Sequence, residues 1–345
     1  MKAAYLTQFG GPEVLQYGDL PVPSIGAGEV LIRVRATALN RLDLFRRAGQ
    51  RGTKSALEKP LVLGCDIAGE VAEAGTGVKG IAPGDRVIVN PGITCGTCVY
   101  CQSARDNMCF SYTMIGSQAD GGYAEYAKAP AENVHKVTAA LGWAQLAAIP
   151  LTTLTAWHML TSVARLRPSE TVLIQAAGSG VGSAALQIAK LIGARTIVTA
   201  GTDEKLARAK AMGADETINY EKDDFSVRVK EMTGGAGVEV VFDHIGEATF
   251  EKNIASLARG GRYVNCGVTS GHMAKLHIGQ LFTKQVQLSG SFMGTKAEFR
   301  EVVALVNRGK LTGVVGREFA LQEAAEAHRV MESRDFYGKL VLLPA

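Results

Sequence analysis

The second half of the chain alternates apolar strands with amphipathic helices, and this alternation limits the fold more than any other feature. A strand expected at 171–176 leads through a glycine-rich turn into a helix at about 183–192. Further strands are expected at 194–200, 217–220, 238–243, 261–267 and 286–290, with helices at 204–212, 224–232 and 250–258. Parallel strands need helical crossovers between them. The pattern therefore predicts an α/β fold with a doubly wound parallel sheet.

The first 90 residues have a different pattern of apolar and turn-forming residues. Short apolar stretches such as Glu29–Ala36, Gly69–Ala74 and Asp85–Asn90 are separated by glycine and proline, as in a β-rich domain. The last residues read as a helix followed by one strand, Gly338–Leu343. A length of 345 residues suits two domains.

Composition narrows the function classes. Hydrophobic residues make up 47% and charged residues 20%, and the formal charge is +4 with no Lys/Arg run longer than two. We therefore expect neither a nucleic-acid partner nor a disordered chain. No apolar stretch is long enough to span a bilayer, and the first residues lack the apolar core of a signal peptide. We expect a cytoplasmic protein that acts on a small molecule.

Four cysteines follow one another at short spacing. Cys95, Cys98, Cys101 and Cys109 form Cys-x2-Cys-x2-Cys-x7-Cys. Four thiolates complete a tetrahedral Zn²⁺ with no open position, which is typical of a structural site. An iron–sulfur cluster also accepts four thiolates, and four ordinary buried cysteines are the remaining alternative. The spacing favours one structural zinc per chain.

The glycine-rich turn after the strand at 171–176 predicts a nucleotide site. Glycine lets the backbone approach a pyrophosphate whose charge lies at the N-terminus of the following helix. The match to the fingerprint is imperfect. Gly180-x-Gly182-x-x-Ala185 fits G-x-G-x-x-A, while a register that starts one turn earlier begins with Ala177 and has Ser179 at the middle glycine. A merely structural tight turn is the alternative. The candidate binding residues are Gly178, Ser179, Gly180, Val181 and Gly182.

The end of the next strand bears on the choice of cofactor. NAD sites place a carboxylate there for the ribose hydroxyls, whereas this strand ends in Ala200 and Gly201. Thr202 and Lys205 could instead meet a 2′-phosphate, although Lys205 could also be an ordinary solvated helix residue. This strand end favours NADPH over NADH.

With these motifs in place, the chain resembles the medium-chain dehydrogenases/reductases, which include zinc alcohol dehydrogenases and quinone oxidoreductases. Gly64-Cys65-Asp66-x2-Gly69-x5-Gly75-x2-Val78 has the spacing of the zinc alcohol dehydrogenase signature, and the segments 83–87 and 121–126 are similar to family landmarks. The resemblance implies a GroES-like catalytic domain, 1–151 and 292–345, interrupted by a Rossmann dinucleotide-binding domain, 152–291. The four-cysteine loop lies where that family carries its structural zinc.

Departures from the family concern the catalytic zinc. Its three ligand positions fall on Asn40, Cys65 and the neighbourhood of Leu151. A catalytic zinc needs three protein ligands and one open position, and Cys65 with Asp66 could offer two at most. The resemblance also places Leu42 where alcohol dehydrogenases have the hydroxyl of their proton relay. An alcohol dehydrogenase with an unusual zinc site and a non-catalytic NADPH-binding protein remain alternatives.

Without the catalytic zinc ligands, the chain is similar to the zinc-free quinone oxidoreductase branch of the family. Asn40-x2-Asp43 matches that branch, and 149–157 resembles its segment beside the nicotinamide, with Thr155 as the contact. Phe45 departs from the branch, since relatives often carry a tyrosine there. We expect NADPH-dependent reduction of a quinone or an α,β-unsaturated carbonyl, with Asn40 as a donor or positioning group.

Several of these residues have a plainer explanation. Asn40 and Asp43 could simply cap the following helix, without a role in the site. Cys65 could be an ordinary small buried residue. Tyr220 and the pair Cys266–Gly267 end strands where cofactor binds in such sheets, or they only pack. The pocket walls are expected in 45–57 and 281–293, and the edge strand 286–290 suggests a homo-oligomer, a dimer or a tetramer.

Overall fold

The computed structural model describes residues 1–50, 57 and 59–345. The chain divides into two compact units, one of Met1–Leu151 with Thr295–Ala345 and one of Thr152–Gly294. Part of the segment 45–57, expected to wall the pocket, lies outside the described residues. In the part of the chain that the structure describes, no helix is long and apolar enough to cross a membrane.

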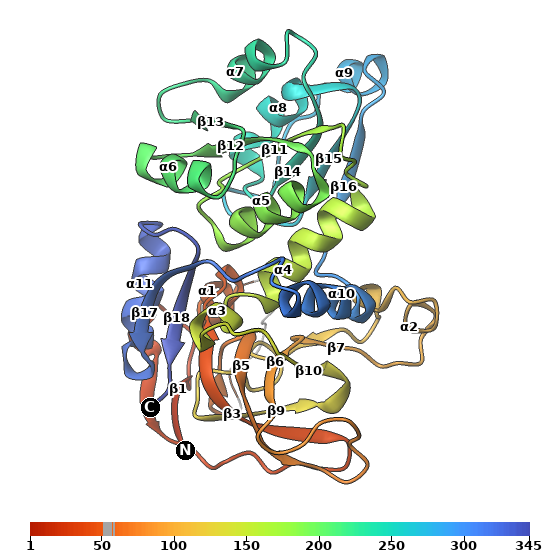
Figure 1. Cartoon of the computed structure of the whole chain (residues 1–345). Coiled ribbons are helices and arrows are strands. Elements are labelled where there is room, and N and C mark those ends of the chain that lie inside the picture. The colour runs from red at the N-terminus through yellow and green to blue at the C-terminus, as the bar shows by residue number, and fades with distance from the viewer. Residues whose placement is uncertain (51–56, 58) are drawn as a thin grey trace. The chain divides into compact units, whose positions relative to one another are not determined.

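The first unit is built on a sheet with the strand order β10-β6-β5-β3-β18-β17, and β9 also pairs with β3 (Figure 1). A second sheet has the order β2-β1-β4, and β7 pairs with β8. The strands are β1 (Lys2–Leu6), β2 (Gln16–Asp19), β3 (Glu29–Ala38), β4 (Leu61–Val62), β5 (Asp66–Ala74), β6 (Arg86–Val89), β7 (Gly92–Ile93), β8 (Thr113–Met114), β9 (Tyr126–Pro130), β10 (Val134–Lys136), β17 (Val315–Ala320) and β18 (Lys339–Leu343).

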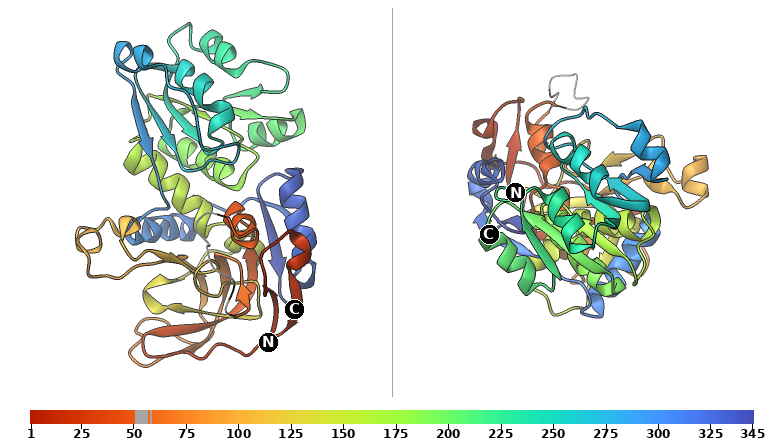
Figure 2. Two further views of the ribbon diagram at one scale, coloured as in Figure 1. Left: turned by 180° about the vertical axis from the view of Figure 1, so that it is seen from behind. Right: turned by 90° about the horizontal axis from the view of Figure 1, so that it is seen from above.

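Helices of this unit are α1 (Arg41–Arg47), α2 (Val99–Gln102), α3 (Trp143–Ala147), α10 (Lys296–Asn307) and α11 (Ala324–Ser333), and α4 (Pro150–Trp157) runs across the division. The C-terminal strand β18 pairs antiparallel with β3. The last segment therefore completes the sheet begun by the first, and the two termini lie near each other in every view (Figures 1 and 2).

Alternating apolar residues explain the sheet core. Val30, Ile32 and Val34 of β3 are buried together with Ile67 of β5 and Val87 of β6. Every second residue of a strand faces the same side, so these side chains form one apolar layer. Asp66 and Lys339 interrupt this pattern, because each is buried and charged at the start of its strand.

The second unit is the doubly wound sheet that the alternation predicts. Its six strands are all parallel in the order β13-β12-β11-β14-β15-β16. They are β11 (Thr171–Ile174), β12 (Arg195–Ala200), β13 (Glu216–Asn219), β14 (Val238–Asp243), β15 (Leu257–Asn265) and β16 (Gln287–Gly290), and the helices are α5 (Gly180–Ile192), α6 (Asp203–Ala211), α7 (Phe225–Met232), α8 (Glu247–Ser256) and α9 (Ile278–Thr283).

The strand order reverses between β11 and β14. Right-handed crossovers place helices on opposite faces when the direction of winding changes, and α5 and α6 indeed lie on the face opposite α7 and α8 (Figure 1). A ligand of such a sheet binds at the carboxyl ends of the strands beside this reversal. By this rule the loops after β11 and β14 are where a ligand of this sheet is expected.

The C-terminal segment differs from the sequence expectation, because it holds two helices, α10 and α11, and two strands, β17 and β18, where one helix and one strand were expected. Two element boundaries in the second unit differ as well. Helix α5 begins at Gly180, not near 183, because Ser179 caps it and the glycines form its first turn. Strand β15 begins at Leu257, where the sequence predicts the end of a helix, and it continues through a pair of glycines. Glycine has a low intrinsic helix and strand propensity, so its presence hid both boundaries.

Candidate active site and thiol cluster

Four cysteines of the segment after β7 gather as their spacing predicts. The Sγ atoms of Cys95, Cys98, Cys101 and Cys109 all lie within 4.8 Å of one another. Three of the pairs are 3.5, 3.6 and 3.9 Å apart. Zn–S bonds of 2.3 Å in a tetrahedron place sulfurs about 3.8 Å apart, so the thiols fit a tetrahedral ion of that size.

Backbone N–H groups face these sulfurs. The amide of Cys98 donates to Sγ of Cys95, and the amide of Cys95 donates to Sγ of Cys109, each over 3.4 Å. Hydrogen bonds from the Thr97 and Cys98 backbone lower the pKa of Cys95 to about 6, whereas burial raises the pKa of Cys101 to about 11. The thiolate is the metal-binding form, so Cys95 is prepared for a cation at neutral pH and Cys101 would give up its proton to the metal.

A buried ammonium group occupies the centre of the other candidate site. Nζ of Lys339 lies 2.6 Å from Oδ1 of Asn40 and 2.8 Å from Oδ2 of Asp66. Nδ2 of Asn40 donates to the same Asp66 oxygen over 2.9 Å. An ammonium only donates and a carboxylate only accepts, which fixes the orientation of the Asn40 amide. All three side chains are buried.

Asp66 also holds the start of a helix. Its Oδ1 accepts a hydrogen bond of 2.7 Å from the backbone N–H of Leu151, the second residue of α4. A negative charge is favourable at a helix N-terminus. Asp66 thus joins β5, the C-terminal strand through Lys339 and the beginning of α4.

Lys339 was not predicted as a site residue, because its partners are distant in the chain, 299 and 273 residues away. One signal was present. Lysine opens a strand of otherwise apolar residues, Lys339–Leu343, and a lysine that is buried needs a paired partner.

Asp43 lies beside this group and acts as a helix cap. Its Oδ2 accepts from the backbone N–H of Asn40 over 2.7 Å, and its Oδ1 faces the backbone N–H of Gly64. The Asn40 side chain, in contrast, is turned to Lys339 and Asp66. Complete burial raises the pKa of Asp43 to about 7.

A chain of buried polar groups continues from Asp43. The hydroxyl of Tyr123 lies 3.3 Å from Oδ2 of Asp43 and 3.2 Å from Nε2 of His328. Nδ1 of His328 lies 3.0 Å from Arg47, which also pairs with Glu332. Burial, helped by the charge of Arg47, lowers the pKa of His328 to about 3.

These two shifts predict opposed effects of pH on stability. Between its usual pKa of 3.8 and about 7, Asp43 holds a proton that the unfolded chain lacks, so stability falls as pH rises. His328 is neutral when folded but charged when unfolded between about 3 and 6.5, so it makes stability rise. Asp43→Asn should leave His328 unopposed. We expect the free energy of unfolding of Asp43→Asn, measured relative to the wild type, to rise by about 1.4 kcal/mol per pH unit between pH 4 and 7. Urea unfolding at successive pH values measures it.

Asp335→Asn is the matched control, because this aspartate of the same unit is exposed. Its stability curve should run parallel to that of the wild type. A parallel curve for Asp43→Asn as well would mean that Asp43 is already ionised in the folded protein at acidic pH.

Cys65 is buried next to both carboxylates. Burial and the nearby charges of Asp43 and Asp66 raise its pKa well above the usual range. A neutral thiol is a poor nucleophile and a poor metal ligand. Of the three positions matched to catalytic zinc ligands, Asn40 is hydrogen-bonded to Lys339, Cys65 is a buried thiol and Leu151 has no donor side chain. Among the described residues, the four-cysteine set is the one group of His, Cys, Asp or Glu side chains close enough to hold a metal.

Thr155 belongs to the second unit. Its side chain is buried in α4, and Oγ1 lies 3.9 Å from Sδ of Met293. Met293 has a positive φ of 52°, which is uncommon for a residue with a side chain. Thr155 therefore faces the segment that follows β16.

The glycine-rich loop has the geometry of a nucleotide loop. Ser179 caps α5 by accepting a hydrogen bond of 2.9 Å from the Gly182 backbone. A Cβ atom on Gly182 would lie 2.5 Å from the carbonyl oxygen of Ala176, so only glycine fits this close approach of helix to strand. Gly178, Gly180 and Val181 complete the turn, and Gly180 begins the helix.

At the end of β12 no carboxylate points back toward that loop. Asp203 lies in the first turn of α6, where its oxygens bond Asn219 and Lys222, each over 2.6 Å. Thr202 caps α6 by accepting from the backbone N–H of Lys205. The ring of Tyr220 lies against Gly201, because a Cβ there would be 2.8 Å from the tyrosine oxygen. The structure thus brings Tyr220 to the strand end that carries Thr202.

Cys266 and Gly267 directly follow β15, at the carboxyl edge of the sheet. Burial and the charge of Asp243 raise the pKa of Cys266 to about 12, so its thiol is neutral. A Cβ on Gly267 would lie 2.6 Å from the carbonyl oxygen of His244. The loops after β14 and β15 therefore pack tightly together.

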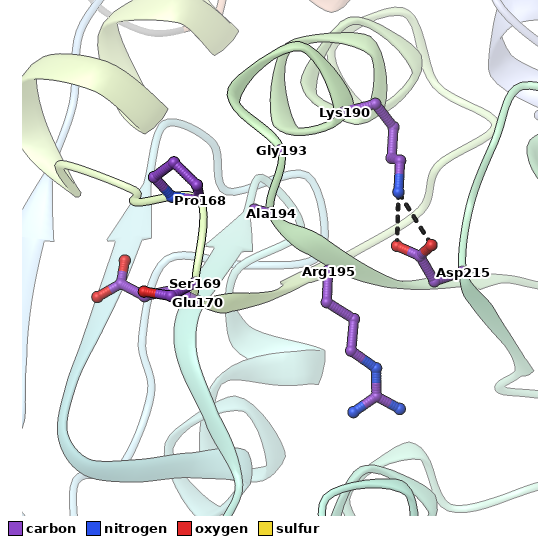
Figure 3. Close-up of a pocket in the computed structure, with 8 residues that line it drawn as sticks. All are labelled: Pro168, Ser169, Glu170, Lys190, Gly193, Ala194, Arg195 and Asp215. Atoms are coloured by element: carbon purple, nitrogen blue, oxygen red, sulfur yellow. Dashed lines mark hydrogen bonds and ion pairs between the residues drawn. The ribbon is translucent and has the colours of Figure 1, made fainter.

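A surface pocket of the second unit lies at the opposite end of the sheet. Its walls come from the residues before β11 and from the start of β12, and they include Glu170, Lys190 and Asp215 (Figure 3). Lys190 faces Asp215 across 2.8 Å, and Glu170 pairs with Arg262. Its charges are thus already paired, and we do not place the active site there.

Comparison with known proteins agrees with both units. Residues 26–139 match the family model described as an alcohol dehydrogenase GroES-like domain, and residues 180–308 match the one described as a zinc-binding dehydrogenase. A solved structure of an NAD-dependent alcohol dehydrogenase is 46% identical, with a TM-score of 0.95 and 99% of each chain covered.

Curated relatives have several activities in their names. Quinone oxidoreductase 1 of Escherichia coli is 32% identical over 97% of each chain. A 2-haloacrylate reductase of a Burkholderia species is 32% identical over 99% of this chain and 98% of its own. Together with the fold, these similarities establish that the chain belongs to the medium-chain dehydrogenase/reductase superfamily of oxidoreductases.

Proposed function

We propose that this oxidoreductase reduces quinones or α,β-unsaturated carbonyl compounds with NADPH and uses no catalytic zinc. The observation that carries the proposal is the group around Lys339. The three positions that would ligate zinc hold an amide that is hydrogen-bonded to Lys339, a single buried thiol and a leucine. Oxidising a simple alcohol without a Lewis acid is difficult, because the metal otherwise stabilises the alkoxide.

Conjugate reduction needs no Lewis acid, in contrast to alcohol oxidation. NADPH, when bound, supplies a hydride for the β-carbon of the substrate, negative charge then develops on the carbonyl oxygen, and a proton from solvent completes the reduction at the α-carbon. One well-placed hydrogen-bond donor can stabilise that oxygen. Asn40 is our candidate for this donor. One hydrogen of its Nδ2 is bonded to Asp66. The other faces the carbonyl of Ala38 at 3.5 Å, the limit of a hydrogen bond, so it could turn to the substrate oxygen. Lys339 holds this amide in place.

The names of the relatives support a reductase but do not choose among substrates. Quinone oxidoreductase and 2-haloacrylate reductase are names of enzymes that reduce conjugated compounds. The structure at 46% identity is called an alcohol dehydrogenase, which keeps alcohol oxidation at an unusual site as the second candidate.

A panel of substrates tests the proposal. Purified protein with NADPH should reduce several enones or quinones and should not reduce simple aldehydes at comparable rates. Turnover of alcohols and aldehydes alone would support the second candidate. Tight NADPH binding without turnover of any compound would indicate a binding protein that has lost its chemistry, and it would contradict the proposal.

We also propose that the four-cysteine cluster holds one structural Zn²⁺. The sulfur separations match the tetrahedron of that ion, and four protein ligands leave no open position for a substrate. Iron–sulfur clusters use the same ligands, but they colour a protein. A colourless preparation with zinc bound would separate the two.

Cofactor preference follows from the end of β12. We propose that Thr202 and Lys205 face the 2′-phosphate of NADPH, since Asp203 is engaged by Asn219 and Lys222. Lys205→Ala should weaken NADPH binding about ten-fold, the effect of losing one hydrogen bond to a charged group, and should leave NADH binding unchanged. Fluorescence titration measures both. Lys210→Ala is the control, because Lys210 lies on the same helix but bonds the carbonyl of Asp215. Equal weakening of NADPH and NADH would contradict a 2′-phosphate role.

The edge of the second unit favours a homo-oligomer. Strand β16 ends its sheet, and Ile278, Phe282 and Leu288 at this edge are exposed hydrophobic residues. Unpaired strand edges invite pairing, and a two-fold axis would pair β16 with its own copy. Light scattering should give a dimer or larger for the wild type and a smaller species for Leu288→Lys. Val227→Lys, an exposed residue of α7, should change nothing. A monomeric wild type would contradict this.

A further inference from the structure

One serine and one histidine form a pair beside the glycine-rich loop, and neither the family fingerprint nor the cap accounts for the pair. Ser179 stands at the middle glycine in one of the two registers of the fingerprint. His244 follows β14 on the other side of the strand-order reversal. We propose that the Ser179 hydroxyl donates a hydrogen bond to the pyrophosphate of the cofactor and that His244 orients it. This inference rests on the nicotinamide dinucleotide of the proposed function.

The protonation of His244 follows from its neighbours. Its Nε2 lies 3.1 Å from the carbonyl oxygen of Gln175. A carbonyl oxygen only accepts hydrogen bonds, so Nε2 must carry the hydrogen. The same Nε2 lies 3.1 Å from Oγ of Ser179. The single Nε2–H is shared between the Gln175 carbonyl and the serine oxygen, so Nε2 has no lone pair with which to accept the serine hydrogen.

The serine oxygen has two lone pairs and one hydrogen. One lone pair accepts the backbone N–H of Gly182 over 2.9 Å, and the other faces Nε2–H of His244. The hydroxyl hydrogen is left, and Ser179 itself is only half-buried. This hydrogen can donate outward, at the N-terminus of a 13-residue helix where negative charge is favoured. At this position a serine offers a hydroxyl donor in addition to the backbone N–H that a glycine would offer.

The loop that carries His244 is held rigidly. The buried carboxylate of Asp243 accepts the backbone N–H of Ile245 over 2.9 Å and that of Gly246 over 3.2 Å. The hydroxyl of Tyr263 donates to the same carboxylate over 2.7 Å. His244 itself is buried. A fixed imidazole can hold the serine hydroxyl in one rotamer before the ligand arrives, which reduces the entropic cost of binding.

Binding measurements on the whole chain test the pair. Ser179→Ala should raise the Kd for NADPH about ten-fold or more, and Ser179→Thr should restore much of the affinity. The Kd for 2′-AMP, which has no pyrophosphate, should stay the same. Ser183→Ala is the matched control, because this serine of the same helical turn bonds the carbonyl of Gly180.

His244→Gln adds a double-mutant cycle. If His244 acts through the serine, this change should weaken NADPH binding in the wild type and have little further effect in Ser179→Ala. Equal Kd values for wild type and Ser179→Ala would overturn the inference, and so would parallel losses of NADPH and 2′-AMP affinity, which would reduce Ser179 to a helix cap. A wild type that binds no nicotinamide dinucleotide would instead overturn the proposed function.

Discussion

Lys339→Met should lower the free energy of unfolding by about 3–5 kcal/mol, the cost of leaving one partner of a buried ion pair alone. The ammonium group lies 2.8 Å from Asp66 and 2.6 Å from Asn40, and the Asp66 carboxylate is fully buried. Methionine nearly matches the volume of lysine but cannot donate. The carboxylate would keep the Asn40 amide and the Leu151 N–H as partners and would lose its countercharge. Urea unfolding at pH 7 measures the change.

Two further variants make this expectation specific. Lys339→Met combined with Asp66→Asn removes both charges and should recover part of the loss, because no buried charge is left without a partner. Lys2→Met breaks an ion pair of the same 2.8 Å length between exposed side chains and should change stability little. A loss for Lys339→Met no larger than that for Lys2→Met would mean that Asp66 is not charged in the folded protein.

The same substitution reports on catalysis. Without Lys339 the oxygen of the Asn40 amide loses its donor, and only the hydrogen bond from Nδ2 to Asp66 still orients the amide. We expect kcat for enone reduction to fall more than KM rises, because the lost interaction positions a donor that acts in the transition state. An unchanged kcat in folded Lys339→Met would separate Asn40 from the reaction.

Cys95→Ser should release the metal of the four-cysteine cluster and open the segment 95–109. Structural zinc contributes on the order of 10 kcal/mol of binding energy in small zinc domains, and three thiolates hold it far less well than four. Limited proteolysis should cut the variant within this segment and leave the wild type intact. Cys266→Ser, which changes a thiol of the other unit, should resist like the wild type. Equal resistance of Cys95→Ser would show that the segment is held without metal.

The doubly wound sheet could be predicted from the sequence because each strand and helix has its own apolar period. The four-cysteine cluster could be predicted because its members lie within 15 residues of one another, so local spacing almost determines the geometry. In both cases the information is local.

The Lys339 group could not be predicted in the same way. Its members come from β18, from the cap of α1 and from β5, and only the pairing of β18 with β3 and of β3 with β5 brings them together. Sequence reasoning could find Asn40 and Asp66 through the family resemblance, but it assigned no partner to either. The Ser179–His244 pair has the same origin, because two loops separated by 65 residues meet where the strand order reverses.

Zinc content tests the central claim most directly. Elemental analysis of thoroughly desalted wild-type protein, set against the protein concentration, gives zinc per chain. A value near one, together with NADPH-dependent reduction of an enone by the same preparation, is the predicted result. A value near two would mean that Cys65 and Asp66 take part in a second metal site. That result would contradict catalysis without zinc, and it would make alcohols and aldehydes the substrates of this enzyme.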